Sequence, residues 1–314
     1  MKISVVVPTY NEEIAIAGNV HEIVKALEGL GESWELILVN DGSRDNTLSI
    51  IQGLARDNSN IKVVSYPVNK GRGFALRIGF RAAQGDYIIA TESDLTWGSK
   101  IFGRFLRELE KGETDMVIAS PHMEGGKMEN VPFLRWLLSY LGNIIFSFAL
   151  PGHLTMCTGM TRAYRREVLD ALDLESDDKD LHVEILYKAL DLGFRVTEIP
   201  SVLRWKKPEP GVKVRKSHFK FKSIFKHLLL SFGIQPFLLF GTAGFSLIGL
   251  GAIFSVYLLI LSVLGTRVAG RPLLFVAVLL ILVGFQTLIF GFLANQSREL
   301  KRQLSRMARD TRKK

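Results

Sequence analysis

The chain has 314 residues, with 40 Lys and Arg against 31 Asp and Glu, a formal net charge of +9 and a mean hydropathy of +0.19. Its single cysteine, Cys157, excludes a fold held by internal disulfides. Residues 204–314 hold 19 of the cations and 3 of the acids, so an acidic N-terminal part is followed by a basic and apolar C-terminal part. Basic charge next to apolar segments predicts a membrane as partner and no nucleic acid.

Short runs rich in β-branched residues alternate with amphipathic stretches along the first part of the chain. The apolar runs are ISVVV (3–7), ELILV (35–39), KVVSY (62–66), DYIIAT (86–91) and DMVIAS (115–120). The stretches with helical spacing lie at about 12–29, 44–57, 72–84 and 99–111. Runs that are apolar on both faces are typical of parallel strands covered by helices on each side. The pattern predicts an α/β domain with a mostly parallel sheet over residues 1–210.

Polar residues follow three of these apolar runs, at Thr9 to Glu12, Asn40 to Ser43 and Glu92 to Asp94. In an open parallel sheet, ligands bind in the crevice beyond the carboxyl ends of the strands. The sequence therefore predicts that the three clusters meet in one site. From the residues alone, Glu92 and Asp94 are either ligands of a divalent metal ion that holds a phosphate or an ordinary polar end of a strand.

Two later segments combine apolar and charged residues. Residues 133–150 are apolar with few breaks but contain Arg135 and Asn143, which fits a helix at the membrane surface or a buried core helix. Residues 211–233 place phenylalanine and leucine on one helical face and lysine on the other. This second pattern predicts a basic amphipathic helix at the membrane interface.

Two uncharged segments follow, at about 237–264 and 272–295. Each exceeds the roughly 20 residues that cross a bilayer, and the short loop between them predicts a transmembrane hairpin over 234–297. Lys and Arg are concentrated outside the hairpin, in 211–233 and in the tail 298–314. The positive-inside rule predicts a multi-pass protein of the cell membrane, with the N-terminal domain, both termini and the basic tail in the cytoplasm.

Four motifs in the N-terminal domain occur together. They are VVVPTYNEE (5–13), LVNDGSRDNT (38–47), NKGRGFALRIGFRAAQGDYI (69–88) and ESDL (92–95). In this combination the chain resembles family 2 of the inverting glycosyltransferases, which have the GT-A fold, a Rossmann-like α/β fold. The two C-terminal spans narrow the resemblance to the dolichyl- and polyprenyl-phosphate hexose synthases. The motif resemblance covers about residues 3–204, and the hairpin matches in architecture rather than in residues.

The resemblance implies a nucleotide-diphosphate sugar as donor. The donor-binding positions carried over onto this chain are Pro8, Tyr10, Glu12, Asp41, Lys70 and Ser93. Pro8 is also expected to end the first strand, because proline cannot extend a ladder. Glu12 has the simpler interpretation of an acid at a helix N-terminus, and Asp41 that of a turn residue bonded to its own backbone. Asp41 suits uracil and guanine equally, so both the GDP-mannose and UDP-glucose types of donor stay open.

The family usually carries Asp-x-Asp where this chain has Glu92 and Asp94. In the family the second acid binds Mg²⁺ or Mn²⁺, which bridges the donor diphosphate, and hard cations prefer such oxygen ligands. The resemblance therefore implies Mg²⁺ or Mn²⁺ as cofactor, held by Asp94 and Glu92. This chain departs from the family in having Glu in place of the first Asp, and Thr96 where relatives often have Gln.

The residues implied for the transfer step are Asp94, Arg135, Arg204 and Glu184. The two arginines would clamp the donor diphosphate and the acceptor phosphate, unless they are only charges at a membrane surface. Cys157 lies where several relatives carry an acid that is proposed as a base. A lipid phosphate has a second pKa of about 6 and needs little proton abstraction. The missing acid therefore favours a phosphate acceptor over a hydroxyl.

Three functions fit the sequence. The first is a metal-dependent hexosyltransferase in the membrane that moves a hexose from a nucleotide sugar to a polyisoprenyl (dolichyl) phosphate with inversion. The second transfers to a hydroxyl of a lipid or glycan. The third is a degenerate homologue that binds nucleotide sugar or lipid without catalysis, which the departures at Glu92, Thr96, Pro121 and Cys157 favour. We predict the first, with the lipid bilayer as a partner and with a homo-oligomer left open.

Overall fold

The computed structural model describes residues 2–132, 137, 143, 154–205, 236–268 and 270–312. These residues form two compact units, an α/β unit and a helical unit at the C-terminal end. The two segments expected at the membrane interface, 133–150 and 211–233, lie outside the described residues except for Leu137 and Asn143. Arg135 lies outside them as well.

The α/β unit contains the strands β1 (Ile3–Thr9), β2 (Trp34–Asp41), β3 (Ile61–Tyr66), β4 (Tyr87–Ala90), β5 (Met116–Ser120), β6 (Lys127–Glu129), β7 (Arg162–Arg165), β8 (Val196–Pro200) and β9 (Val202–Arg204). Its helices are α1 (Ile16–Glu28), α2 (Thr47–Asp57), α3 (Arg72–Ala82), α4 (Ile101–Glu110), α6 (Arg166–Asp170) and α7 (Leu181–Asp191). Every strand and helix predicted between residues 3 and 120 is present, with ends that differ by four residues at most.

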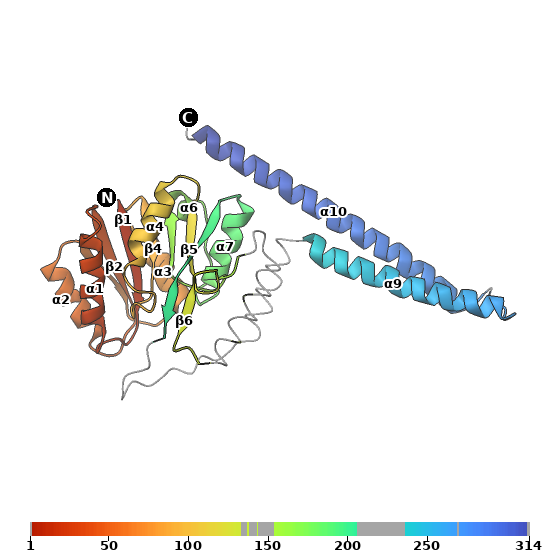
Figure 1. Ribbon diagram of the computed structural model, residues 1–314, viewed down its shortest axis with the longest axis horizontal. Coiled ribbons are helices and arrows are strands. Elements are labelled where there is room, and N and C mark those ends of the chain that lie inside the picture. Colours follow the sequence, from red (N-terminus) through yellow and green to blue (C-terminus); the bar gives the residue numbers. More distant parts are fainter. Residues whose placement is uncertain are drawn as a thin grey trace. The chain divides into compact units, whose positions relative to one another are not determined.

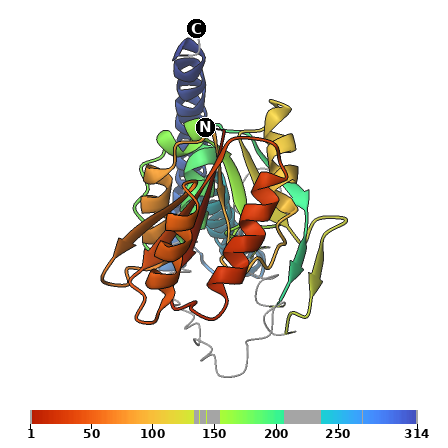
Figure 2. The same ribbon diagram turned by 90° about the vertical axis from the view of Figure 1, so that its left-hand side faces the viewer.

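The main sheet has seven strands in the order β3-β2-β1-β4-β7-β5-β8 (Figure 1). Within the described residues β7 is its one antiparallel strand, paired with β4 on one side and β5 on the other. The predicted mostly parallel α/β fold is therefore confirmed, and β7 and β8 are the strands of this sheet that lie outside the five apolar runs of the sequence. A small parallel sheet of β6 and β9 lies beside the main one (Figure 2).

The centre of the sheet is covered on both faces. Every residue from Ile3 to Val7 in β1 is fully buried, although successive side chains point to opposite faces. The prediction that Pro8 ends this strand is wrong, because β1 continues to Thr9 against β2. Pairing of β1 with β4 stops at Val6, so the missing N–H of Pro8 removes no ladder hydrogen bond on that side.

Helix α3 packs very closely on β1 and β2 through Gly79. A Cβ atom on Gly79 would lie 2.3 Å from Cγ1 of Val6 and 3.0 Å from Cγ2 of Val39. Only a residue without a side chain allows this approach. The close packing fixes α3 against the strands whose carboxyl ends form the site described below.

The helical unit consists of α9 (Pro236–Val263) and α10 (Pro272–Arg312), which pack against each other as an antiparallel hairpin. Their backbones approach at small residues. A Cβ on Gly244 would lie 2.8 Å from the carbonyl oxygen of Gly284, and a Cβ on Gly251 would lie 2.8 Å from that of Ala277. Such contacts between small residues are typical of helix pairs in membranes.

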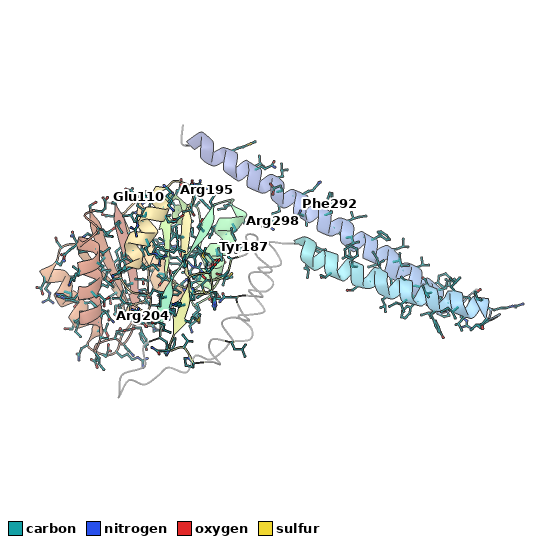
Figure 3. The ribbon with its side chains drawn as sticks, viewed as in Figure 1. Glu110, Tyr187, Arg195, Arg204, Phe292 and Arg298 are labelled. Atoms are coloured by element: carbon teal, nitrogen blue, oxygen red, sulfur yellow. The ribbon has the colours of Figure 1, made fainter. Side chains whose placement is uncertain are left out.

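Both helices are long and apolar enough to cross a membrane. The segments are Leu239–Val263, with mean hydropathy 2.3, and Pro272–Leu300, with mean hydropathy 2.8. Only 11% of each segment is buried within the protein, whereas a core helix of a soluble protein would be mostly covered. Their outer side chains are large and exposed, as Phe292 illustrates in Figure 3. The basic residues predicted as a separate tail continue α10 without a break to Arg312.

The packing at Gly79 yields a prediction with a matched control. Gly79→Ala should lower the free energy of unfolding by about 1 to 3 kcal/mol, because the added methyl group overpacks the contact with β1. Gly53→Ala in α2 should raise it by about 0.5 to 1 kcal/mol, because nothing lies within 4 Å of its Cβ position and alanine favours a helix. Urea denaturation of the full chain in detergent, followed by circular dichroism, measures both. Equal stability of the two variants would contradict the role of Gly79.

Candidate active site

The polar clusters at the ends of β1, β2 and β4 meet, as the sequence predicted. Thr9 and Asn40 are register partners at the ends of β1 and β2. The Ser93 hydroxyl, just after β4, donates to Oε1 of Glu12 across 2.9 Å. The backbone N–H of Glu12 in turn donates to Oγ1 of Thr47 at the start of α2. Glu12, Ser93 and the two acids on either side of Ser93, Glu92 and Asp94, therefore lie in one site at the carboxyl edge of the sheet.

Glu12 is a carboxylate in an environment that disfavours its charge. Burial raises its pKa, and the nearby acids Asp94 and Asp45 raise it further. The hydrogen bond from Ser93 and the guanidinium of Arg72 act in the opposite direction but do not cancel the effect. A ligand that donates hydrogen bonds or brings positive charge to Glu12 would relieve this cost.

Glu92 and Asp94 differ in how they are held. Oε2 of Glu92 accepts a 2.6 Å hydrogen bond from the Thr161 hydroxyl, just before β7. Oδ1 of Asp94 accepts the N–H of Thr96 at 3.2 Å, and its second oxygen has no hydrogen bond within the described part of the chain. Leu95, directly after Asp94, has φ 51°, a left-handed conformation that is rare for leucine. Strained backbone of this kind is concentrated at functional sites.

Glu92 also carries an unfavourable charge. Burial is the main cause that raises its pKa, and the neighbouring Asp94 adds to it. Arg72 and the hydrogen bond from Thr161 lower the pKa by less. Two acids on one short loop, with Arg72 acting on Glu92, form a site that favours additional positive charge.

The two acids fit a divalent cation that is shared with a ligand. Among the described residues, no group of three or more His, Cys, Asp and Glu side chains is arranged to hold a metal ion by itself. Mg²⁺ is usually bound by one or two carboxylates together with phosphate oxygens and water. The free oxygen of Asp94 and the nearby carboxylate of Glu92 match that pattern. The fit therefore requires a phosphate-bearing ligand to complete the coordination.

Arg72 is a site residue that the sequence analysis missed. It is the first residue of α3, and it is close enough to lower the pKa of both Glu12 and Glu92. A cation at the start of a helix is opposed by the helix dipole. Here the negative charges of Glu12 and Glu92 offset this unfavourable interaction with the dipole. The motif KGRG contains this arginine two residues after Lys70, the cation that the resemblance implies for donor binding.

The start of α3 is pressed against the segment before α7. The N–H of Phe74 donates to the carbonyl of Asp177 at 3.1 Å. A Cβ on Gly71 would lie 2.5 Å from the Asp177 carbonyl oxygen, and one on Gly73 equally close to that of Asp178. The glycines of the KGRG motif therefore serve this close approach between backbones rather than a phosphate loop.

His182, near the start of α7, is the second residue that sequence reasoning missed. Its side chain is buried, and neither ring nitrogen has a hydrogen-bond partner among the residues that the structure describes. Burial lowers its pKa well below the usual value, and Arg162 and Arg72 lower it further, so the imidazole is neutral. Its carbonyl accepts a 2.6 Å hydrogen bond from the fully buried Arg162. Buried polar side chains are usually hydrogen-bonded, so an unpaired one is costly.

Asp41 is buried and anchors the loop that leads into α3. Its carboxylate accepts hydrogen bonds from the Asn69 side chain and from the N–H groups of Lys70 and Gly71. The sequence offered a nucleobase ligand or a turn that bonds its own backbone. The structure shows a third arrangement, in which Asp41 holds a loop that is 28 to 30 residues away in the chain. Its role toward a nucleobase stays a prediction.

Lys70 and Tyr10 line the same edge. The Lys70 side chain is exposed, and its ammonium lies 4.4 Å from the centre of the Phe74 ring. Tyr66 packs edge-on against that ring at 5.2 Å. Tyr10 follows directly after β1 and is partly exposed. An exposed cation beside aromatic rings is the kind of surface that a nucleotide site uses, and the roles of Lys70 and Tyr10 toward a nucleotide stay predictions.

Arg204 lies beside the acid loop. Its N–H donates to the carbonyl of Thr96 at 2.8 Å, which ties the end of β9 to the segment that carries Asp94. Its guanidinium pairs with Glu129 of β6 at 2.9 Å, and the side chain is 71% exposed (Figure 3). Arg204 thus lies next to the site. Its exposed ion pair with Glu129 contributes little free energy, so the guanidinium can exchange Glu129 for a ligand. The predicted partner Arg135 lies outside the described residues.

Glu184 has a structural role that the sequence did not reveal. Its oxygens accept the N–H groups of Glu175 and Ser176 and the ammonium of Lys188. Burial acts to raise the pKa of Glu184, but these hydrogen bonds outweigh it and lower the pKa. Both oxygens are therefore engaged in holding the segment before α7. The predicted acceptor-side role remains untested, and this bonding gives it no support.

Cys157 lies where relatives of the predicted family carry an acid, and it is not a base. The side chain is fully buried. Burial raises the pKa of its thiol to about 12. Its N–H donates to the Asn143 side chain, and its carbonyl accepts from Arg162. The residue behaves as a small core side chain, as buried cysteines commonly do.

Solved structures identify the fold. Glucosyl-3-phosphoglycerate synthase from Mycobacterium tuberculosis in complex with uridine diphosphate superimposes with a TM-score of 0.54 at 21% identity, covering 74% of this chain and 80% of that one. The same enzyme with Mn²⁺, UDP-glucose and phosphoglyceric acid gives a TM-score of 0.50 at 19% identity, covering 74% and 78%. At these identities the likeness concerns the fold alone. The α/β unit has the GT-A fold of glycosyltransferases.

The family follows from sequence comparison. The family model "Glycosyl transferase family 2" matches residues 4–173, more than half of the chain, so the protein belongs to glycosyl transferase family 2. A dolichol-phosphate mannosyltransferase from Pyrococcus furiosus is 31% identical over 231 residues, which cover 73% of this chain and 62% of that protein. The chain therefore matches less than two thirds of that relative. An undecaprenyl-phosphate 4-deoxy-4-formamido-L-arabinose transferase from Pseudomonas fluorescens is 29% identical over 294 residues, 93% of this chain and 83% of that one.

The raised pKa of Glu92 predicts a trade-off between stability and ion binding. Glu92→Gln should raise the thermal midpoint of the ligand-free protein at pH 7, because it removes a charge that burial disfavours and keeps an acceptor for Thr161. An acid whose folded pKa is raised loses stability as pH rises through that pKa, so the gain should shrink toward pH 4.5. Glu28→Gln on the exposed face of α1 is the control.

Differential scanning fluorimetry of the full chain in detergent, with Mn²⁺ or with EDTA, measures both effects. Mn²⁺ together with a nucleoside diphosphate should stabilise the wild type more than Glu92→Gln, because binding to the folded state alone shifts the midpoint. A variant that is less stable than the wild type without ligand would show that the ionised Glu92 stabilises the fold.

Proposed function

We propose that this protein is a membrane-bound, metal-dependent inverting hexosyltransferase. It transfers a hexose from a nucleotide-diphosphate sugar to a polyisoprenyl phosphate and forms a lipid-phosphate sugar. The observation that carries the proposal is the convergence of Glu12, Ser93 and the Glu92–Asp94 pair at the carboxyl edge of a GT-A sheet. The same chain carries a hairpin of two apolar helices, which accounts for a lipid acceptor rather than a soluble one.

The relatives support the acceptor. Both matched relatives are named for sugar transfer to a polyprenyl-type phosphate, dolichol phosphate in one and undecaprenyl phosphate in the other. The buried, protonated Cys157 supplies no base at the position where the family can carry an acid. A phosphate acceptor does not need one, because it is largely dianionic at pH 7. A hydroxyl acceptor would need a base to remove its proton.

The proposed cofactor is Mg²⁺ or Mn²⁺, held by Asp94 and Glu92 together with the donor diphosphate. When bound, the ion would neutralise charge on the leaving nucleoside diphosphate. The protein's own residues do the rest. Glu12, Asp41 and Lys70 hold the nucleoside, with Pro8, Tyr10 and Ser93 around it. Arg204 leaves Glu129 to bind a phosphate, and Arg135 is the proposed second clamp.

The reaction then follows from position and charge. An oxygen of the acceptor phosphate attacks the anomeric carbon on the face opposite the diphosphate, and the carbon–oxygen bond to the diphosphate breaks. The configuration is therefore inverted, and no proton transfer is needed. Electrostatic stabilisation of the departing diphosphate by cationic groups is typically the largest catalytic contribution. Arg72, whose charge acts on both Glu12 and Glu92, would take part in this stabilisation.

The test is transfer to polyprenyl phosphate by the full-length protein in detergent, with UDP- or GDP-hexose and with Mn²⁺ or EDTA. Asp94→Asn should reduce lipid-linked sugar, read by mass, by about 100-fold or more. Asp86→Asn, an exposed aspartate in the turn before β4, should leave the rate unchanged. Equal transfer to unphosphorylated polyprenol would establish a hydroxyl acceptor. Nucleotide binding without transfer to either lipid would point to a degenerate homologue.

The proposed topology places the α/β unit and both termini in the cytoplasm, as the positive-inside rule requires. The only native cysteine is buried, so introduced cysteines can be labelled selectively. In intact cells, Thr266→Cys in the hairpin loop should react with a membrane-impermeant maleimide. Gln303→Cys in α10 should react only after the membrane is permeabilised. The reverse pattern would invert the orientation, and labelling of both in intact cells would exclude the hairpin.

A further inference from the structure

Three large apolar side chains are exposed on the α/β unit, and all three lie on loops. They are Ile14, which is 63% exposed, Val68, also 63%, and Met123, 37%. Within the described residues of this unit, no other large apolar side chain is exposed. A single exposed apolar residue is common on protein surfaces and needs no explanation. The position that these three share does need one.

The three loops lie at the same edge of the main sheet. Ile14 follows β1, Val68 follows β3 and Met123 follows β5. The three strands run in one direction, because β1 is parallel to β2 and β4, and β2 is parallel to β3. Strands β4 and β5 are both antiparallel to β7, so β5 has the same direction as β4. The loops therefore belong to the carboxyl edge, where the candidate active site also lies.

The apolar side chains are spread across that edge. Strands β3 and β5 are five positions apart in the sheet, with β1 between them. At about 4.8 Å between neighbouring strands, Val68 and Met123 follow strands that are about 24 Å apart. A single small ligand cannot cover side chains at such a separation, whereas an extended apolar layer can contact all three at once.

The backbone of each loop is held by hydrogen bonds. The turn 12–15, which carries Ile14, is closed by an N–H to carbonyl bond of 3.1 Å. The turn 123–126 is closed by a bond of 2.8 Å. Asn69, directly after Val68, is bonded to the carboxylate of Asp41. Since these loops are tied down, their apolar side chains are held outward and cannot simply turn into the core.

The same chain supplies a bilayer for this edge to meet. The hairpin of α9 and α10 is long and apolar enough to cross a membrane, and the proposed acceptor carries its phosphate at the membrane surface. Charges of both signs lie beside the apolar side chains, since Glu13 and Glu124 are exposed there as well as Lys70. Apolar side chains on a fixed frame without an excess of cations favour insertion into the headgroup boundary over attraction to anionic lipid.

We propose that the carboxyl edge of the α/β unit contacts the bilayer directly, through Ile14, Val68 and Met123. The inference rests on the proposed function and adds the surface through which the site meets its lipid substrate. The site then faces the headgroup region, so a lipid phosphate reaches it while the polyisoprenyl chain stays in the bilayer.

The experiment places one fluorophore at a time on the full-length protein in phosphatidylcholine nanodiscs, with or without a lipid that carries a nitroxide near its headgroup. Ile14→Cys, Val68→Cys and Met123→Cys can be labelled selectively, because the single native cysteine is buried. Each label should lose at least about half of its fluorescence to the nitroxide lipid, since interfacial groups lie about 5 to 10 Å into the boundary. Ser59→Cys, in the loop before β3 at the opposite edge, is the matched control and should lose little.

Equal quenching at the carboxyl edge and at Ser59→Cys overturns the inference. Shielding from a water-soluble quencher without quenching by the nitroxide lipid also overturns it, because a protein surface such as a second copy would then cover the edge. The measurement needs no substrate. Sugar transfer by a protein without lipid contact at this edge therefore refutes the inference alone, and lipid contact without any transfer refutes the proposed function alone.

A combined variant tests the consequence for the reaction. Ile14→Ser, Val68→Ser and Met123→Ser together should lower transfer to a long-chain polyprenyl phosphate in nanodiscs by at least about tenfold, because apolar contact with the bilayer is lost. Transfer to a short, water-soluble isoprenyl phosphate should stay unchanged, and Ser59→Ala should affect neither. Thermal unfolding confirms that the variants are folded. An equal loss with both acceptors would show that the loops serve the site itself, which overturns the inference.

Discussion

The hydrogen bonds that Asp41 accepts from residues 69–71 are the contact on which the site depends. They join the end of β2 to the loop after β3 and so fix where α3 begins. That position places Arg72 close to Glu12 and Glu92 and presses Gly71 and Gly73 against the backbone before α7. One buried carboxylate thereby positions the cation that compensates the other acids. Since charge-assisted bonds to backbone N–H groups are strong, the loop is held without any ligand.

Glu12 and Glu92 differ from Asp41, because the protein does not compensate their negative charges. Glu12 and Glu92 both have raised pKa values, because they are buried and lie near Asp94 with too little positive charge around them. Leu95 adds backbone strain on the same loop. His182 is a further buried polar group, neutral and without a hydrogen-bond partner within the described part of the chain. A site of this kind is unfavourable when empty, and binding of a cation and a diphosphate would recover part of the cost.

The sequence predicted the elements whose signals are local. Runs such as ISVVV are apolar on both faces, so β1 to β5 and the helices between them were placed within a few residues. The meeting of Glu12 with Ser93 followed from the rule that parallel strands end at one edge. Antiparallel β7 was missed, because its short sequence RAYR carries no alternation. The bonding of Glu184 was missed too, because its partners Glu175 and Ser176 come from an irregular segment with no pattern to read.

The resemblance implies an aspartate at the position of Glu92. Strand β7 explains what the longer glutamate side chain contacts. Thr161 stands at the entrance to β7, which pairs with β4, and its hydroxyl holds the carboxylate of Glu92 at 2.6 Å. The glutamate side chain reaches this neighbour from the segment that follows β4. One acid is thereby tethered to the sheet, and Asp94 keeps an oxygen free among the described residues. Glu92 is thus held by the protein, whereas Asp94 is the acid with an oxygen left for the ligand that we propose.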